Sequence, residues 1–137
     1  MRTATFAELD TTTLYKLLRL RVDVFVVEQS CPYPELDGLD TEPDTVHLWL
    51  EEDGEILGYL RILAGRRIGR VCVAKRARGG GYAGRLMAGA LALLGDRECV
   101  LDAQSHLVDF YRRYGFAPDG PEYVEDGIPH VPMRRLR

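Results

Sequence analysis

Three consecutive glycines in the middle of the chain, Gly79 to Gly81, constrain its fold more than any other feature. They separate an apolar run that ends at Val73 from a segment of helical periodicity that begins near Ala83. Glycines leave main-chain amides uncovered and permit positive φ angles, and the first amides of a helix have no partner within the helix. Such a turn can therefore cradle an anion such as a pyrophosphate, with Arg76 and Arg78 as further charged contacts.

Two familiar phosphate-binding loops do not match this turn. A Walker loop enters its helix with Gly-Lys-Ser/Thr, whereas this chain has Gly84-Arg85-Leu86. A Rossmann unit opens with an N-terminal parallel strand and places an acidic residue about 20 residues after its glycines. Here the turn follows antiparallel strands. A plain strand-to-helix connection stays open as the alternative.

A length of 137 residues predicts one domain, residues 1–137, and the periodicity of apolar residues predicts the α+β (mixed α/β) class. Asp10 or Thr11 is the expected N-cap of a first helix that ends near Gln29. Residues 35–44 are expected to form an acidic, solvated loop. Strands are predicted at 46–51, 56–63, 68–73 and 99–102, helices at 83–94 and 105–114, and short strands near 116, 122–124 and 131–133. A right-handed crossover then lies at the centre.

Charge and cysteine content exclude several classes of partner. The formal net charge is -3, and the 18 Lys and Arg residues are scattered along the chain, which argues against nucleic acid as the main partner. No apolar run approaches the roughly 20 residues that span a bilayer, so no membrane association is expected. The 3 cysteines lack metal or redox spacing, which predicts no metal site and a reduced, cytoplasmic setting.

Two motifs together resemble a known family. Residues 78–83, RGGGYA, resemble the R/Q-x-x-G-x-G/A signature by which GNAT N-acetyltransferases hold the pyrophosphate of acetyl-coenzyme A. Residues 110–116, FYRRYGF, are similar to the late F-Y-x-x-x-G-F segment of that family, and residues 20–29, 37–38 and 127–130 resemble its ElaA-type branch. The resemblance implies the GNAT acyl-CoA N-acyltransferase fold, a mixed central sheet with splayed parallel strands flanked by helices. Those strands are expected at 68–73 and 99–102.

The resemblance implies transfer of acetyl from acetyl-coenzyme A to a primary amine, of a small molecule or of a protein lysine or N-terminus, by direct attack in a ternary complex. Tyr111 occupies the place of the general acid, and Gln104 that of an asparagine which contacts coenzyme A. Core packing for Tyr111 and helix capping for Gln104 are the alternatives. The expected cosubstrate contacts are Val71, Cys72, Val73, Arg76, Arg78, Gly79, Gly80, Gly81, Tyr82, Ala83, Gly84, Gln104 and Tyr111.

The general base is left open, because strand residues 70–73 lack the glutamate that many GNAT enzymes use. The candidate bases are Glu28, His47, His130, Glu125 and Asp126. The candidate lining of an acceptor pocket is Phe25, Tyr33, Trp49, Glu125 and Asp126, with core packing as the alternative for the aromatic residues. Cys72 lies in an apolar strand and is expected to be a buried hydrophobe, which disfavours an acyl-cysteine route.

Two other functions compete with amine acetylation. The segment from Leu20 to Gln29, with Asp37 to Asp40, also resembles acyl-homoserine lactone synthases, although the intact glycine signature favours coenzyme A. A sensor that binds coenzyme A without turnover is the second alternative, because the strand carboxylate is missing. The acceptor, the acyl chain and formation of a homodimer stay open.

Overall fold

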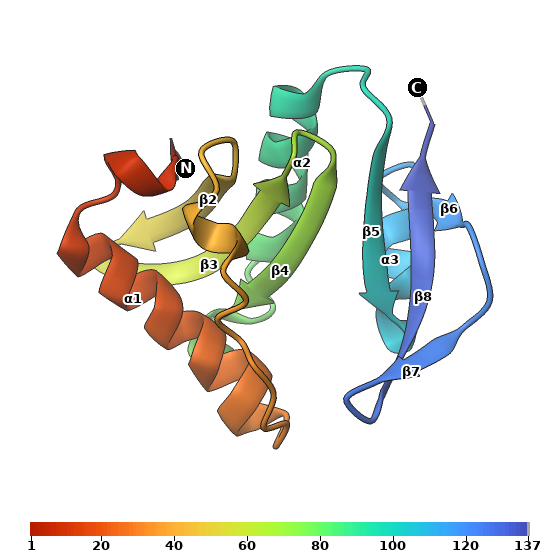
Figure 1. Ribbon diagram of the computed structural model, residues 1–137, viewed down its shortest axis with the longest axis horizontal. Helices are drawn as coiled ribbons and strands as arrows, with labels where there is room; N and C mark the ends of the chain where they lie inside the picture. Colours follow the sequence, from red (N-terminus) through yellow and green to blue (C-terminus); the bar gives the residue numbers. More distant parts are fainter. Residues whose placement is uncertain (137) are drawn as a thin grey trace.

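The computed structural model describes residues 1–136 and arranges them as one mixed sheet with helices on both faces (Figure 1). The strands are β1 (Arg2–Ala4), β2 (Val46–Glu52), β3 (Glu55–Leu63), β4 (Arg67–Val73), β5 (Cys99–Gln104), β6 (Ala117–Pro118), β7 (Tyr123–Glu125) and β8 (Ile128–Arg135). The helices are α1 (Thr11–Val22), α2 (Tyr82–Leu94) and α3 (Val108–Arg112), with a π-helix at Asp23–Glu28. The strand order is β1-β2-β3-β4-β5-β8-β6, and β7 pairs with β8.

The first half of the sheet is antiparallel, as expected for the strands that precede the glycine turn. β2 pairs with β3 and β3 with β4 over nearly their whole lengths. β1, which the sequence analysis did not predict, adds to the outer edge of β2. It has only 3 residues, too few for a recognisable period.

The first helix begins where the sequence predicted and changes geometry before its expected end. Asp10 is the N-cap, and its carboxylate accepts a hydrogen bond of 2.7 Å from the amide of Thr13. α-Helical geometry ends at Val22, and the chain continues as the π-helix to Glu28. Such wide turns often occur at functional sites.

The parallel strands diverge as expected. β4 and β5 share one register pair, Arg67 opposite Val100, and the amide of Val100 donates to the carbonyl of Arg66 at 2.9 Å. β5 instead pairs along its full length with β8. Beyond this first pair, the edge of β4 that faces β5 has no strand partner among the described residues.

Two hydrophobic clusters hold the helices against opposite faces of the sheet. α1 contributes Leu17 and Leu20 to one cluster, while α2 and α3 contribute Leu86 and Tyr111 to the other. In Figure 1, α1 accordingly lies in front of the sheet and α2 and α3 lie behind it.

The C-terminal elements differ in length from the predictions. The helix expected at 105–114 is a 3-10 turn at Ser105–Leu107 followed by the short α3. The short strand expected at 131–133 is part of β8, which has 8 residues and pairs with three other strands. Two prolines within it, Pro129 and Pro132, hid this strand in the sequence, because proline is typical of strand edges and loops.

Candidate active site

A cavity of about 800 Å³ lies where β4 and β5 diverge. The π-helix and residues 29–37 line it on one side, and β5, α3 with the turn before it, and the β7–β8 hairpin line it on the other. The predicted site residues that line it are Phe25, Glu28, Tyr33, Val71, Cys72, Val73, Arg78, Ala83, Gln104, Tyr111, Glu125, Asp126 and His130. Those outside the lining are His47, Trp49, Arg76, Gly79, Gly80, Gly81, Tyr82 and Gly84.

Tyr111 reaches the cavity from α3 while most of its ring is buried. Its side chain packs edge-on against Phe110 and Phe116, and the residue is 6% exposed. Burial raises the pKa of Tyr111 to about 12, with a smaller contribution from the nearby Cys72. The phenol is therefore protonated at neutral pH and is a hydrogen-bond donor.

Cys72 lies on β4 and is buried. Burial raises the pKa of its thiol to about 12. Because the thiolate is the nucleophilic form, a thiol held neutral in this way is a poor nucleophile. This environment fits the predicted role of a small buried hydrophobe.

The glycine turn has the backbone geometry that binds anions. Gly81 is the N-cap of α2 with a φ of +79°, and Gly79 has a φ of +87°. No side chain caps this helix, and the turn and loop hydrogen bonds within residues 1–136 do not use the amides of 79–84. These amides lie at the positive end of the dipole of α2. The turn meets the cavity at Arg78 and Ala83.

Arg78 forms an ion pair across one end of the cavity. Its Nη1 and Nη2 atoms lie 2.5 and 2.8 Å from the two carboxylate oxygens of Glu28, and Nη2 also donates to the carbonyl of Val73 at 3.1 Å. Hydrogen bonds from Arg78 hold the pKa of Glu28 below its usual range. Glu28 is therefore ionised but already engaged, which makes it a weak candidate for the base.

His130 lines the cavity, and its Nε2 atom forms no hydrogen bond with residues 1–136. Its Nδ1 atom lies 2.8 Å from the carbonyl oxygen of Ile128, and its ring stacks on Tyr123. A carbonyl only accepts hydrogen bonds, so Nδ1 carries the hydrogen and Nε2 of the neutral ring keeps its lone pair. His130 and the carboxylates of Glu125 and Asp126 are thus the predicted bases that line the cavity and keep a lone pair for a proton within the described part of the chain.

Direct contacts join the two walls of the cavity. The side-chain amides of Gln29 and Gln104 pair at 3.3 Å, which links the end of the π-helix to the end of β5. The thiol of Cys31 donates to the carbonyl of Asp126 at 3.4 Å. These contacts hold the walls together beyond the point where the strands have separated.

Charge around the cavity is balanced except at the β7–β8 hairpin. The carboxylates of Glu28, Asp37 and Asp102 pair with Arg78, Arg61 and Arg67, respectively. Glu125 and Asp126 are exposed and form no ion pair within the described part of the chain. This hairpin therefore contributes uncompensated negative charge, which attracts cations.

Residues 35–44 form the predicted loop, and most of them are exposed. The expectation that its charges are solvated is wrong for three carboxylates, which enter a closed network that we term the ion-pair ring. Glu35 and Asp40 are 5% and 7% exposed. The ring joins Arg21 on α1, Arg61 on β3 and Arg70 on β4 to Glu35, Asp37 and Asp40, with nitrogen–oxygen distances of 2.5 to 3.4 Å. Burial of these carboxylates is offset by the hydrogen bonds of the guanidinium groups.

His47 does not lie at the cavity. It is buried next to the ion-pair ring, where Nε2 lies 3.1 Å from the carbonyl of Asp40 and Nδ1 lies 2.6 Å from the hydroxyl of Tyr59. The carbonyl requires a hydrogen on Nε2, so the lone pair of Nδ1 accepts from Tyr59. Neither nitrogen is free to act as the base, and the structure removes His47 from the candidates.

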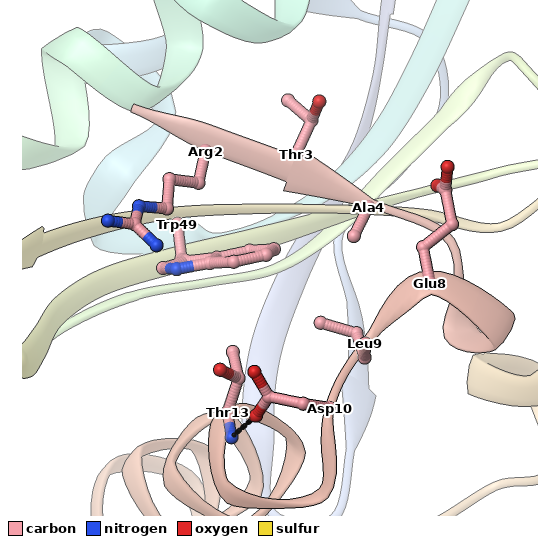
Figure 2. A pocket seen from close by; sticks show the side chains of 8 residues that line it. All are labelled: Arg2, Thr3, Ala4, Glu8, Leu9, Asp10, Thr13 and Trp49. Atoms are coloured by element: carbon pink, nitrogen blue, oxygen red, sulfur yellow. Dashed lines mark hydrogen bonds between the residues drawn. The ribbon is translucent and has the colours of Figure 1, made fainter.

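Trp49 also lies elsewhere. It lines a separate pocket of about 420 Å³, formed by β1, the following turn and the start of α1. Figure 2 shows its ring beside Arg2. Its predicted place in the acceptor pocket is therefore wrong. Strand periodicity showed that Trp49 alternates with apolar neighbours but not which end of the sheet it would reach.

Two predicted cosubstrate contacts bind the β2–β3 hairpin instead of facing the cavity. Arg76 forms an ion pair with Glu55, and the hydroxyl of Tyr82 donates to Glu52 at 2.9 Å.

Several polar residues of the lining were missed by the sequence analysis: Asp37, Arg61, Arg67, Arg70, Asp102 and His106. Arg70 carried a signal, since it is a lone charge within the apolar run Ile68 to Val73. Within residues 1–136, no group of His, Cys, Asp or Glu side chains could hold a metal ion. No helix in this range is long and apolar enough to cross a membrane.

Known proteins resemble the chain over nearly its whole length. ElaA of Escherichia coli is 41% identical over 94% of this chain and 91% of ElaA, and its crystal structure superposes with a TM-score of 0.91. The crystal structure of an acyl-CoA N-acyltransferase from Pseudomonas aeruginosa is 45% identical, covers 98% of both chains and gives a TM-score of 0.90.

A third structure shares the fold alone. The coenzyme-A-dependent acyl-homoserine lactone synthase BjaI superposes with a TM-score of 0.80 at 20% identity. The family described as the acetyltransferase (GNAT) domain matches residues 21–137. With the divergent strands and the relationship to ElaA, this match shows that the chain belongs to the GNAT acetyltransferase family and its ElaA-type branch.

Proposed function

We propose that the protein transfers acetyl from acetyl-coenzyme A to a primary amine by direct attack in a ternary complex. The observation that carries the proposal is the divergence of β4 and β5 after the single pair Arg67 and Val100, beside a cavity lined by Tyr111. The open edge of β4 offers main-chain groups to an extended arm, and Tyr111 offers a proton to a leaving group.

The residues present fit acetyl-coenzyme A. The uncovered amides of 79–84 at the start of α2 suit a pyrophosphate, since they offer donors and a favourable dipole without a lysine. Val71, Val73 and Leu101 give the cavity apolar walls, which suit a pantetheine chain. Arg78 would reach a phosphate by exchanging its contact with Glu28.

The chemistry assigns one role to each of three groups. Nε2 of His130 accepts a proton from the amine nitrogen as the new C–N bond forms. A main-chain amide of residues 71–73 stabilises the developing oxyanion. Tyr111 donates its proton to the sulfur as the C–S bond breaks. The buried thiol of Cys72 supports direct attack over an acyl-enzyme.

The test measures acetylated product by mass spectrometry with a panel of primary amines. Tyr111→Phe is expected to lower kcat by roughly 10² to 10⁴-fold, the usual contribution of a general acid, while the Kd for coenzyme A stays within about twofold. Tyr15→Phe is the matched control, because Tyr15 is exposed on α1 and lies outside the cavity lining.

Other outcomes would favour the competing functions. Saturable binding of coenzyme A without transfer to any amine would favour a sensor. Product formed only from acyl-carrier protein and S-adenosylmethionine would favour lactone synthesis. Equal kcat for Tyr111→Phe and the wild type would remove Tyr111 from the mechanism.

A further inference from the structure

Arg70 has a backbone conformation that residues with a side chain rarely adopt. Its φ is +54°, in the left-handed region. It belongs to a β-bulge: Tyr59 pairs with Cys72 and Arg61 with Gly69, so Leu60 faces both Arg70 and Val71. Glycine is the usual residue at the left-handed position of such a bulge. An arginine at this position, in the wall of the cavity, points to a role for its side chain.

The ion-pair ring uses only part of the Arg70 guanidinium. Nε lies 2.8 Å from Glu35 Oε1, and Nη2 lies 3.2 Å from the Glu35 carbonyl and 3.4 Å from Asp37 Oδ2. The hydrogen bonds and ion pairs of Arg70 with residues 1–136 do not involve Nη1. The side chain is 21% exposed and lines the cavity, so the donors of Nη1 are left for a ligand.

The charge balance of the cavity wall favours a ligand group with a single negative charge. The ion-pair ring has three guanidinium groups and three carboxylates, so a single added carboxylate meets a wall without net charge. The hairpin wall carries the uncompensated Glu125 and Asp126. One side of the cavity therefore offers a fixed cationic donor, and another side attracts an ammonium group.

We propose that Arg70 is a specificity-determining residue that binds a carboxylate of the acceptor, while the acceptor's ammonium or amine group lies toward Glu125 and Asp126. The acceptor is then a zwitterion, a primary amine that also carries a carboxylate. This inference rests on the proposed function, since it names the class of amine acetylated at the same site.

The test compares matched acceptors with and without a carboxylate, namely 4-aminobutyrate against butylamine and lysine against 1,5-diaminopentane. The wild type is expected to prefer at least one carboxylated member about tenfold or more in kcat/KM. Arg70→Gly is expected to raise the KM of that member by about 10 to 100-fold, as for loss of a charge-assisted hydrogen bond, and to change the KM of its counterpart without a carboxylate less than about threefold.

Replacement by glycine isolates the effect of the side chain, because glycine adopts a φ of +54° without strain and removes only the guanidinium and its stem. Ala64→Gly is the matched control: Ala64 has a φ of +52° in the β3–β4 turn and lies outside the lining. Arg70→Lys keeps the charge and is expected to restore part of the preference. Arg70→Lys also replaces the glycine variant in the test if that variant fails to fold. The KM of Arg70→Lys for the carboxylated member must then exceed the wild-type value.

Two results would overturn the inference: wild-type enzyme without preference in either pair, or an Arg70 variant that weakens both members of the preferred pair equally. The second result would make Arg70 purely structural. If no member of either pair is acetylated and the wider panel of amines gives no product either, the proposed function fails, and calorimetry of the same compounds decides on the carboxylate site. Equal affinities for 4-aminobutyrate in the wild type and in Arg70→Gly would then exclude it.

Discussion

At the scale of single residues, surroundings give the same side chain different chemistry. His47 and His130 both lie on strands and both have a ring nitrogen near a main-chain carbonyl. The second nitrogen of His47 is taken by Tyr59, whereas His130 faces the cavity. The sequence offered both as bases, and only the tertiary contacts separate them.

His47 is expected to make folding depend on pH. Burial holds the pKa of its imidazole below the usual value. In the unfolded chain the ring titrates near pH 6.5, so below that pH the unfolded state binds the proton first and the free energy of unfolding falls. Urea unfolding between about pH 7 and pH 5 should show this loss in the wild type and a weaker slope in His47→Gln.

The exposed His106 supplies the control for that slope. His106→Gln is expected to keep the wild-type dependence on pH. An unchanged slope in His47→Gln would show that other groups cause the acid destabilisation.

At the scale of elements, the turn before α2 is the part that sequence patterns describe best. Its glycines predicted left-handed backbone, and Gly79 and Gly81 have positive φ angles. The acidic segment 35–44 is an element whose surroundings the sequence pattern did not predict. Its charges suggested solvent, but Arg21, Arg61 and Arg70 reach it from three elements that are distant in sequence.

Gly81→Val should raise the Kd for coenzyme A by more than about tenfold, measured by calorimetry. A β-branched residue at a φ of +79° is strained, so the turn is expected to shift its amides away from the pyrophosphate. Gly54→Val introduces the same kind of strain at a φ of +77° in the β2–β3 turn, with no nearby atoms, and should leave the Kd unchanged. Equal Kd values for both variants would contradict an anion site in the glycine turn.

At the scale of the whole molecule, the sheet consists of two parts that meet at one parallel pair. β1 to β4 form an antiparallel unit with α1 on one face, and β5 to β8 form a second unit with α3. The Gln29–Gln104 contact and the Cys31–Asp126 contact join them again across the cavity. A ligand between the strands would bridge both units.

Coenzyme A is therefore expected to slow amide hydrogen exchange in β4 and β5, because its arm covers the open edge that the strands leave between them. Adenosine diphosphate lacks this arm and should protect only the glycine turn. The measurement is exchange monitored by mass spectrometry at saturating ligand. The same protection pattern with both ligands would mean that the arm does not enter between the strands.

The sequence by itself determined the order of the main elements and the strand-to-helix glycine turn, because these depend on local periodicity. The splayed mixed sheet was implied by the resemblance of two motifs to the GNAT family. It also pointed to Tyr111 and His130, both of which line the cavity. It missed β1 and the length of β8, since short or proline-rich strands form only against a partner strand.

Only the tertiary structure decided which polar residues meet. The ion-pair ring, the bulge at Arg70 and the burial of His47 each depend on contacts between segments far apart in the chain. From the sequence alone, a charged side chain is predicted to be exposed, because burial of a charge without a partner is unfavourable. The structure supplies the partners, and with them both the wall of the candidate active site and the guanidinium group that faces it.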